Sequence, residues 1–518
     1  MDDAGTVVFS GSAKATVVAG KTATVTVDLQ ELLGSLTVEF TVPAVSTATS
    51  YTVEITHSED KEFSKKETVS DGTSVLFNDL IPGSYTISVQ GMNAGTVVLS
   101  GSATGNVVAG DTDSVRVNLE VSPGSLTVIF SEPSGSTATS FTVEITDSEG
   151  KTISDGSSSQ FDNLAPGTYH IVVEGIDTNN KVVVGGAYSA TVTAGATASA
   201  TVNLVEGVSD YDSLQKAVGN GGTVNILKSI DVPSSLTVGT NVTIQAAYQD
   251  VTLKNISSGN LFIIDNSSGN LTIGGGEYTI TLDGNKVAQS IISVSGGTAT
   301  LADNGIITNA AASGIKISSS GTFEMTGGTI MNNNDSSSNG GGGAVFVQGG
   351  TFTMSGGILK DNTSSTFGGA VRMPSGTCTI TGGSITGNTA GNKGGGVSVG
   401  GGTFELLGGS ISNNSANQGS GVQVTSSTFK MGGSVVVSLN NDVYLYNQTI
   451  TVTSSLTGST TVARITPDSY GIDTAVLTNG MSDAFGLVTE VGKFAVTPNP
   501  ADDSEWTIDT EGKLQKAQ

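Results

Sequence analysis

The sequence predicts an all-β chain in which tandem β-sandwich domains precede a right-handed parallel β-helix, with a short N-terminal helix capping the β-helix. Three observations predict this fold. Glycine supplies 71 of the 518 residues and charged residues only 13%, a composition that favours strands and turns. A repeat of about ninety residues occupies the first 206 residues, and a repeat of 25 to 29 residues follows it. The first period is typical of tandem domains, and the second of a solenoid.

The composition also excludes several classes of partner and site. The formal net charge is -25 and the pI about 4.2, which disfavours nucleic acid and anionic membranes as partners. One cysteine, Cys378, excludes an intrachain disulfide framework and a cysteine-rich metal site. The sequence contains no run of 18 or more apolar residues, so it predicts no membrane-spanning helix. No signal peptide opens the chain, so we expect an export signal to lie upstream of Met1 or to have been removed.

The long repeat defines the sandwich modules. "GTVVFSGSA" at Gly5–Ala13 recurs as "GTVVLSGSA" at Gly95–Ala103, and "STATSYTVEIT" at Ser46–Thr56 recurs as "STATSFTVEIT" at Ser136–Thr146. Within each unit apolar residues alternate with polar ones, as in half-buried strands, and Pro-Gly turns separate the runs. Several short strands in 80 to 90 residues predict a β-sandwich.

These matches place the module boundaries. We expect one module at 33–121 and a second at 122–206. Residues 1–32 match only the last third of a unit, and we interpret them as the remnant of a further one. The shared "LxPGxY" phrase resembles bacterial immunoglobulin-like and carboxypeptidase-regulatory-like modules, and this resemblance implies a spacer or stalk.

Three anchors with one common period define the β-helix, which we place at 222–460. A Thr-aromatic strand, in which cysteine once replaces the aromatic residue, begins at Thr322, Thr351, Thr377, Thr403 and Thr428. The pattern "GG-x-[IL]-x-x-N" begins at Gly327, Gly356, Gly382 and Gly408. A Gly-x-[VI] strand begins at Gly343, Gly369 and Gly395, with the variants "GIKI" at Gly314 and "SGVQV" at Ser420. Three short strands in each period predict coils that stack at about 4.8 Å, and right-handed crossovers are the rule.

This register predicts two files of structural residues along the helix axis. One file faces the interior and comprises Phe323, Phe352, Cys378, Phe404 and Phe429. Because a reactive cysteine needs access and a basic neighbour, we interpret Cys378 as an inert core thiol. The second file comprises asparagines that can hydrogen-bond to the turn backbone and to one another, namely Asn333, Asn362, Asn388 and Asn414.

The two ends of the β-helix are predicted to be capped. Residues 207–221 place Tyr211, Leu214 and Val218 on one face of a short helix that would cover the first coil. Residues 461–518 predict a C-terminal β cap with Trp506 as its anchor.

Residues 207–518 resemble the bacterial right-handed parallel β-helix repeat proteins of the wider pectate-lyase-like superfold, on the strength of the three anchors. The resemblance implies a secreted or surface protein. It leaves the activity open, because such families include polysaccharide lyases, glycoside hydrolases and adhesins.

The sequence offers few candidates for catalysis. Arg372 lies outward in a column with Lys316, Phe346, Ser398 and Gln423, which contains no acid, so we interpret it as a solvated surface arginine. The acidic candidates Asp265, Asp283 and Asp303 fall at the ends of different strands. Glu324 and Glu405 lie three coils apart, roughly 14 Å and too far to act on one glycosidic bond.

Metal and cofactor sites are not indicated. His57 and His170 are predicted to be surface residues rather than ligands. The acidic segment Asp147–Gly156 has the composition of a calcium loop without EF-hand spacing, so no cofactor is expected and calcium is the one alternative. The leading hypothesis is an extracellular or cell-surface bacterial protein that binds a host or matrix glycan or protein. The alternatives are a polysaccharide lyase or glycoside hydrolase, and a passive structural element.

Overall fold

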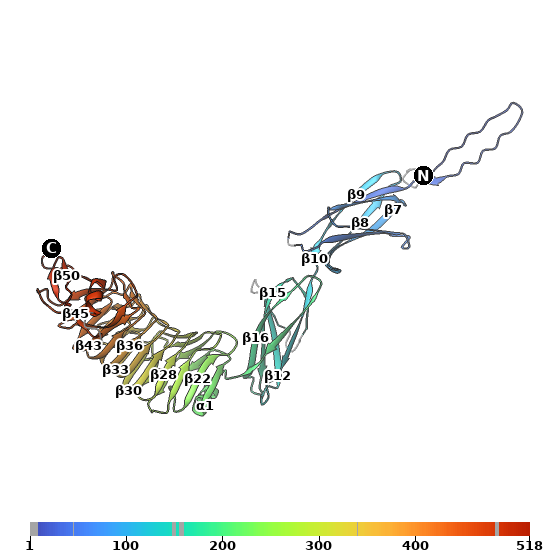
Figure 1. Cartoon of the computed structure of the whole chain (residues 1–518). Coiled ribbons are helices and arrows are strands. Elements are labelled where there is room, and N and C mark those ends of the chain that lie inside the picture. The colour runs from blue at the N-terminus through green and yellow to red at the C-terminus, as the bar shows by residue number, and fades with distance from the viewer. Residues whose placement is uncertain are drawn as a thin grey trace. The chain divides into compact units, whose positions relative to one another are not determined.

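The computed structural model describes residues 9–44, 46–147, 152–154, 160–338, 340–481 and 486–517 (Figure 1). It confirms the predicted all-β class, with sandwich sheets followed by a parallel β-solenoid and only short helices. Two compact units form. The first contains most of both sandwich modules, and the second contains the β-helix together with Glu132–Phe141 and Glu174–Gly186 of the second module.

The first module packs a three-stranded sheet against a five-stranded sheet. Alternating residues of the strands, such as Leu36, Val38 and Ile55, are fully buried in one core. The three-stranded sheet has the order β6 (Ser74–Leu80), β3 (Gly34–Thr41), β9 (Thr112–Asn118). The five-stranded sheet has the order β10 (Glu120–Val121), β8 (Thr96–Val107), β7 (Gly83–Asn93), β4 (Ser50–His57), β5 (Ser64–Val69).

The second module repeats this strand order. Its three-stranded sheet is β14 (Gln160–Leu164), β11 (Gly124–Ser131), β17 (Thr197–Asn203). Its five-stranded sheet is β13 (Thr152–Ser154), β12 (Ser140–Asp147), β15 (Gly167–Ile176), β16 (Val182–Val192), β18 (Val205–Glu206). The sequence repeat is therefore a repeat of topology.

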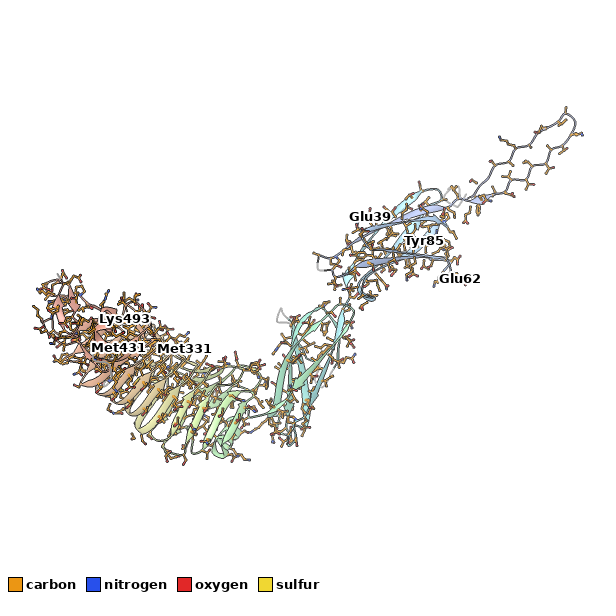
Figure 2. All side chains as sticks on the ribbon, viewed as in Figure 1. Glu39, Glu62, Tyr85, Met331, Met431 and Lys493 are labelled. Carbon is orange, nitrogen blue, oxygen red and sulfur yellow. The ribbon has the colours of Figure 1, made fainter. Side chains whose placement is uncertain are left out.

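The "LxPGxY" phrase closes a corner in both modules. Tyr85 is buried in the first module (Figure 2). Its hydroxyl donates to the carbonyl of Ile81 at 2.9 Å, and the hydroxyl of Tyr169 donates to the carbonyl of Ala165 at 2.9 Å. The bond returns to the backbone four residues upstream and fixes the turn, as in the tyrosine corner of immunoglobulin-like sandwiches. Gly83 has φ +149, and a Cβ there would lie 2.3 Å from Nε2 of His57. The phrase thus encodes a turn geometry rather than a ligand site.

Residues 9–31 repeat the sequence of β8 and β9 but lie in a different environment. Only β1 (Phe9–Ser10) and β2 (Gln30–Glu31) pair in this segment. Phe9, Val17, Val27 and Leu29 are 43–76% exposed, whereas their counterparts in the first module, Leu99, Val107, Val117 and Leu119, are 0–5% exposed. Apolar and polar residues alternate in the same way in both segments. Among the described residues, however, no strands equivalent to β3 and β7 cover the apolar side chains of residues 9–31.

A short helix, α1 (Tyr211–Asn220), precedes the first coil. Asp210 caps it by accepting from the Ser213 backbone amide at 3.1 Å, and Gly221 at φ +82 ends it. Leu214 and Val218 are buried in the same core as the coils. The apolar face of α1 therefore continues the hydrophobic interior of the β-helix.

Three rows of parallel strands build the β-helix, and we name them by their residues. The aromatic row carries the Thr-aromatic strands, the valine row the Gly-x-[VI] strands, and the asparagine row the strands that precede the asparagine file. The first two rows share one 19-stranded sheet, because β30 (Ile315–Met325), β33 (Val345–Met354) and β36 (Val371–Ile380) each pass through both rows.

The remaining strands fall into these rows in register with their neighbours. The aromatic row also contains β19 (Gly222–Ile226), β22 (Asn241–Ala246), β25 (Asn270–Ile273), β28 (Thr298–Leu301), β40 (Gly402–Leu406), β43 (Ser427–Gly433), β46 (Ile450–Leu456) and β48 (Leu477–Asn479). The valine row also contains β21 (Leu236–Thr237), β24 (Phe262–Ile264), β27 (Ile292–Val294), β39 (Val397–Val399), β42 (Val422–Thr425), β45 (Asp442–Tyr446), β47 (Ala463–Pro467) and β49 (Phe494–Val496).

The asparagine row forms a separate nine-stranded sheet, and a fourth, short row follows it. The asparagine row contains β20 (Ile230–Val232), β23 (Val251–Asn255), β26 (Ile280–Asp283), β29 (Gly305–Thr308), β31 (Thr329–Met331), β34 (Ile358–Lys360), β37 (Ser384–Thr386), β41 (Ser410–Ser412) and β44 (Val436–Val437). The short row contains β32 (Asn334–Asp335), β35 (Thr363–Ser364) and β38 (Thr389–Ala390). The right-handed sense of the winding stays a prediction.

The interior file lies where alternation predicts it. Phe323, Phe352, Cys378, Phe404 and Phe429 are Cα partners in successive coils, and each is buried. The rings of Phe323 and Phe352 stack with centroids 5.6 Å apart, and those of Phe404 and Phe429 with centroids 5.1 Å apart. Cys378 fills the position between the two pairs, and burial raises the pKa of its thiol well above the usual range.

We therefore expect Cys378 to resist alkylation in the folded protein. A buried neutral thiol is a poor nucleophile, because the thiolate is the reactive species. Iodoacetamide labelling followed by mass spectrometry should show protection in buffer and complete labelling in denaturant. Fast labelling of the folded chain at neutral pH would contradict the interior position of this column.

The asparagine file forms a continuous hydrogen-bonded ladder. The Oδ1 of Asn333 accepts from the Ala310 amide at 2.9 Å. In the next four members, Asn362, Asn388, Asn414 and Asn441, each Oδ1 accepts the backbone amide and the Nδ2 of the asparagine one coil earlier, at 2.9–3.3 Å. Each Nδ2 in the first four coils also donates to a backbone carbonyl of the preceding coil. The ladder satisfies buried polar groups of the turns, which would otherwise be costly.

The parallel ladder runs past the predicted boundary at residue 460. Strands β45, β47 and β49 pair in parallel, as do β46 and β48. The short helices α2 (Gly486–Glu490) and η1 (Val491–Lys493) and the hairpin β50 (Trp506–Ile508) and β51 (Leu514–Lys516) follow. Buried Glu490 accepts from the Leu456 amide at 2.9 Å and from Lys493 at 2.9 Å (Figure 2). Trp506 is buried at the end of the core, as the sequence predicts.

Candidate functional site

The three acidic candidates lie at the ends of strands from different rows. Asp265 follows β24 of the valine row, Asp283 ends β26 of the asparagine row, and Asp303 follows β28 of the aromatic row. Asp283 accepts from the Asn285 amide at 2.8 Å and from Nδ2 of Asn309 at 3.0 Å, so it orders a turn. Over the described ranges no three His, Cys, Asp or Glu residues form a group that could hold a metal ion.

The two outward glutamates of the aromatic row also stay apart. Glu324 and Glu405 are separated by Thr353 and Thr379 in the same column, and Glu405 pairs with Lys430 one coil on at 2.8 Å. That column does not supply the closely spaced carboxylate pair that glycoside hydrolysis needs.

His57 corrects one expectation, because it is 6% exposed and not a surface residue. Its ring contacts Tyr85 edge-on, with centroids 5.0 Å apart, and its Nδ1 accepts from the Asp60 amide at 3.0 Å. Tight packing against the Pro-Gly corner explains the burial. His170 is exposed. Most of the candidate calcium segment Asp147–Gly156 lies outside the described residues.

Arg372 also differs from its prediction, because it is half-buried rather than fully solvated. The predicted column is correct, since Lys316, Phe346, Arg372, Ser398 and Gln423 are Cα partners in successive coils. However, Ser398 and Gln423 are buried and hydrogen-bond to each other at 2.8 Å.

Turns between the coils cover this outward column. Phe367, Lys393 and Gln418 form parallel bridges in successive turns beside it. Gly394, at φ +69, lies so close that a Cβ there would be 2.7 Å from Cβ of Ser398. Phe367 reaches Arg372, whose guanidinium carbon lies 4.2 Å from the ring centroid. The valine row is therefore overlaid in its later coils and open in its earlier ones.

The open part forms a polar cleft of 400 Å³. We call it the valine-row cleft, and its lining includes Asn260, Gln289, Lys316, Asp335, Phe346 and Gln348. Amides, hydroxyls, one ammonium group and one aromatic ring thus converge from several successive coils. Its size is in the range of small-molecule or oligosaccharide subsites.

Asp335 is the one carboxylate among the described residues that line this cleft. Its Oδ1 accepts from the Ser337 amide at 2.9 Å and from the Ser337 hydroxyl at 2.5 Å, and its Oδ2 accepts from the Gly341 amide at 2.7 Å. These bonds fix the loop that forms one wall. Asp335 is thus positioned to shape the cleft, and the cleft contains no acid–base pair of carboxylates.

Further along the valine row, a second cation contacts aromatic rings. Lys393 lies with its Nζ 5.6 Å from the ring centroid of Tyr444 and 5.8 Å from that of Tyr446. Burial and then the hydrogen bond to Asp468, at 2.7 Å, raise the pKa of Tyr444 to about 12. Tyr444 is therefore a neutral donor at physiological pH, and Tyr446 beside it is exposed.

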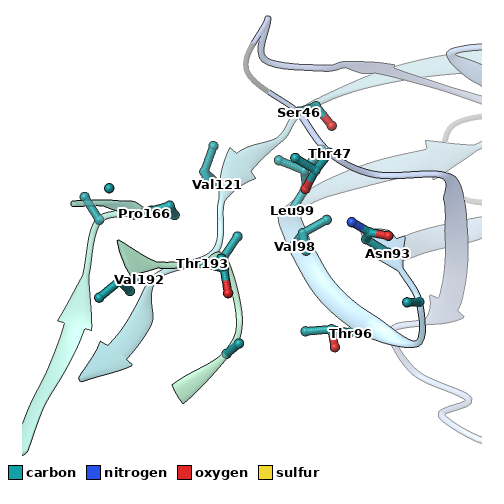
Figure 3. A pocket seen from close by; sticks show the side chains of 15 residues that line it. Ser46, Thr47, Asn93, Thr96, Val98, Leu99, Val121, Pro166, Val192 and Thr193 are labelled. Atoms are coloured by element: carbon teal, nitrogen blue, oxygen red, sulfur yellow. The ribbon is translucent and has the colours of Figure 1, made fainter. Parts of the chain in front are cut away.

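A separate cavity of 770 Å³ lies in the first unit (Figure 3). Val98, Leu99, Val121 and Val192 contribute much of its lining, and none of the described residues that line it is ionisable.

Sequence reasoning missed Asn441, Phe367, Lys393 and Asp335. Asn441 lies nine residues after Gly432, whereas Asn414 lies six after Gly408, so the strict spacing skips it. Phe367 and Lys393 lie in turns and Asp335 in the short strand β32, so the alternation along the three predicted rows does not orient their side chains. The repeated positions of Phe367, Lys393 and Gln418 just before a glycine were the available signal.

No protein-family model matches this chain, and no curated protein matches it. Parts of the chain are similar to parts of solved structures. The Bacillus anthracis TIE protein is 15% identical over 36% of this chain and 38% of its own, with a TM-score of 0.22. A putative adhesin from Bacteroides ovatus is 14% identical over 30% of this chain and 75% of its own, with a TM-score of 0.17.

GBS52, the minor pilin of Streptococcus agalactiae, is 12% identical over 33% of this chain and 96% of its own, with a TM-score of 0.15. At these identities and TM-scores the similarities carry no argument about activity. Among the described residues no helix is long and apolar enough to cross a membrane.

Proposed function

We propose that this chain is a secreted or cell-surface bacterial protein whose β-helix binds a glycan, with the two sandwich modules serving as spacers. The observation that supports it is the valine-row cleft, where amides, hydroxyls, Lys316 and the Phe346 ring face outward from a rigid ladder. A sugar ring offers hydroxyls to amides and an apolar face to an aromatic ring, which is the combination present here.

Binding is favoured over catalysis by the contents of the cleft. Glycoside hydrolysis needs two carboxylates at a defined separation. Only Asp335 is present among the described lining residues, and loop amides and a serine hydroxyl occupy its oxygens. An adhesive role on a repetitive scaffold fits this arrangement better than a lyase or hydrolase role.

The test is binding of the full-length chain to immobilised glycans and matrix proteins. We expect saturable binding to a glycan, weakened about tenfold by Phe346→Ala because the stacking surface is lost. Thr353→Ala, on the same coil but on the aromatic row, is the matched control and should bind like the wild type. Absence of saturable binding, or equal binding by Phe346→Ala, would contradict the proposal. Release of unsaturated or reducing sugars would favour the enzymatic alternative.

A further inference from the structure

The guanidinium of Arg372 has hydrogen-bond donors that no described residue of the chain accepts, so it is able to bind an anion. A guanidinium carries five N–H donors. Among the described residues Arg372 forms no hydrogen bond and no ion pair, and its contact is the stack on Phe367 at 4.2 Å. Burial lowers the pKa of Arg372, and the nearby Asp335 opposes this effect. Among the described residues Asp335 accepts no hydrogen bond from Arg372; its Oδ1 accepts two bonds from Ser337 and its Oδ2 one from Gly341.

Lys316 is a second cation on the same column, two coils before Arg372. Lys316 lines the valine-row cleft, and its ammonium forms no ion pair with a carboxylate of the described residues. Pairing across coils does occur elsewhere, since Lys430 contacts Glu405 of the adjacent coil at 2.8 Å. Two unpaired cations on one column stand out in a chain whose net charge is -25.

The geometry fits one ligand that spans both cations. The Lys316, Phe346 and Arg372 positions are consecutive Cα partners, so the two cationic positions lie roughly 10 Å apart with the Phe346 ring between them. The guanidinium carbon of Arg372 lies 4.2 Å from the centroid of the Phe367 ring, a cation–π contact that uses none of its N–H donors in a hydrogen bond to a carboxylate. The cleft of 400 Å³, which Lys316 and Phe346 line, gives room for a sugar unit.

We propose that the glycan bound in the valine-row cleft carries an anionic substituent, a carboxylate or a sulfate ester, which Lys316 and Arg372 bind on either side of Phe346. This inference rests on the proposed function and specifies its ligand. Lys316 and Asp335 are the charged residues among the described lining of the cleft, and Arg372 lies one coil beyond Phe346, close enough to interact electrostatically with Asp335. Hydroxyls of a neutral glycan can accept from the guanidinium of Arg372, but a carboxylate or sulfate ester forms the stronger, charge-assisted hydrogen bonds.

The experiment compares three polymers on the full-length chain: hyaluronan, which offers only carboxylates, dextran sulfate, which offers only sulfate esters, and neutral dextran. We expect at least one acidic polymer to bind and dextran not to bind. The preferred acidic polymer identifies the anionic group. Binding should weaken with added salt, because the cations are partly exposed.

Arg372→Gln and Lys316→Gln should each weaken binding of the acidic polymer about tenfold or more, since a hydrogen bond to a charged group is lost. Lys360→Gln is the matched control. It lies on the same coil as Phe346 but in the asparagine row, and it removes the same charge. Should Arg372→Gln fold poorly, Lys316→Gln carries the test alone, because no described contact of the fold depends on its ammonium.

The outcomes separate this inference from the proposed function. If Phe346→Ala weakens binding while Arg372→Gln and Lys316→Gln do not, glycan binding stands and the anionic substituent is overturned. If Lys360→Gln loses as much affinity as the other two, attraction by net charge explains the binding and the site is overturned. Lack of binding to both acidic polymers also overturns it.

Discussion

Asn388→Leu is expected to destabilise the β-helix by about 3–5 kcal/mol, because it interrupts the asparagine ladder. The Nδ2 of Asn388 donates to the Leu359 carbonyl at 2.9 Å, to the Thr386 carbonyl at 3.1 Å and to Oδ1 of Asn414 at 2.9 Å. Its Oδ1 accepts the amide and the Nδ2 of Asn362, both at 3.0 Å. Leucine has a similar volume but leaves these buried groups unsatisfied, each at about 1–3 kcal/mol.

Urea unfolding of the full-length chain measures this effect, with fluorescence of Trp506, the one tryptophan of the sequence, as the signal. Asn417→Ala is the control. Its side chain is exposed and donates a single bond, to the Gly391 carbonyl at 3.0 Å, so we expect a change within about 0.5 kcal/mol. Equal midpoints for the two variants would show that the ladder does not stabilise the coils.

The strands and files of the β-helix were predictable because every coil has the same structural requirements. Each coil needs an apolar position inside, a glycine at its corner and an amide for the buried turn, so these residues recur in register. Phe323, Phe352 and Cys378 could be assigned to the interior by alternation alone. The ladder was predictable over four coils and lost at Asn441, where three additional residues shift the spacing.

The candidate site was less predictable. The alternation along a strand gives the direction of a side chain, but it does not show which turns of the chain cover that side chain. Arg372 and Ser398 both point outward on the valine row, but turns overlay them to different extents. Phe367 and Lys393 belong to those turns, and their contacts depend on the stacking of one turn on the next. His57 shows the same limit in the sandwich, since a neighbouring corner rather than its own strand buries it.

These observations connect the architecture to the proposed function. The interior file and the ladder together hold each coil at a constant spacing, so the outward column presents its groups on a stiff support. A binding cleft on such a support loses little conformational entropy when a ligand binds. Because the interior packing provides this stiffness, the shape of the cleft depends on the interior packing.

Phe352→Ala tests that dependence, and we expect it to destabilise the protein by about 3–5 kcal/mol. The ring is fully buried and stacks on Phe323 with centroids 5.6 Å apart. Its other neighbour in the file is the small Cys378, so the new cavity would extend over two coils that lack an aromatic ring. The neighbouring coils cannot shift to fill it, because their spacing is set by backbone hydrogen bonds.

Phe346→Ala is the matched control, because it also replaces a phenylalanine of strand β33 by alanine, and the two side chains differ in pointing outward or inward. Its ring is partly exposed on the valine row, so we expect a loss of only about 1 kcal/mol. Thermal unfolding of both variants and of Thr353→Ala measures the difference. If the two phenylalanine variants lost equal stability, the interior would not depend on the Phe file, and the stiffness of the cleft would need another source.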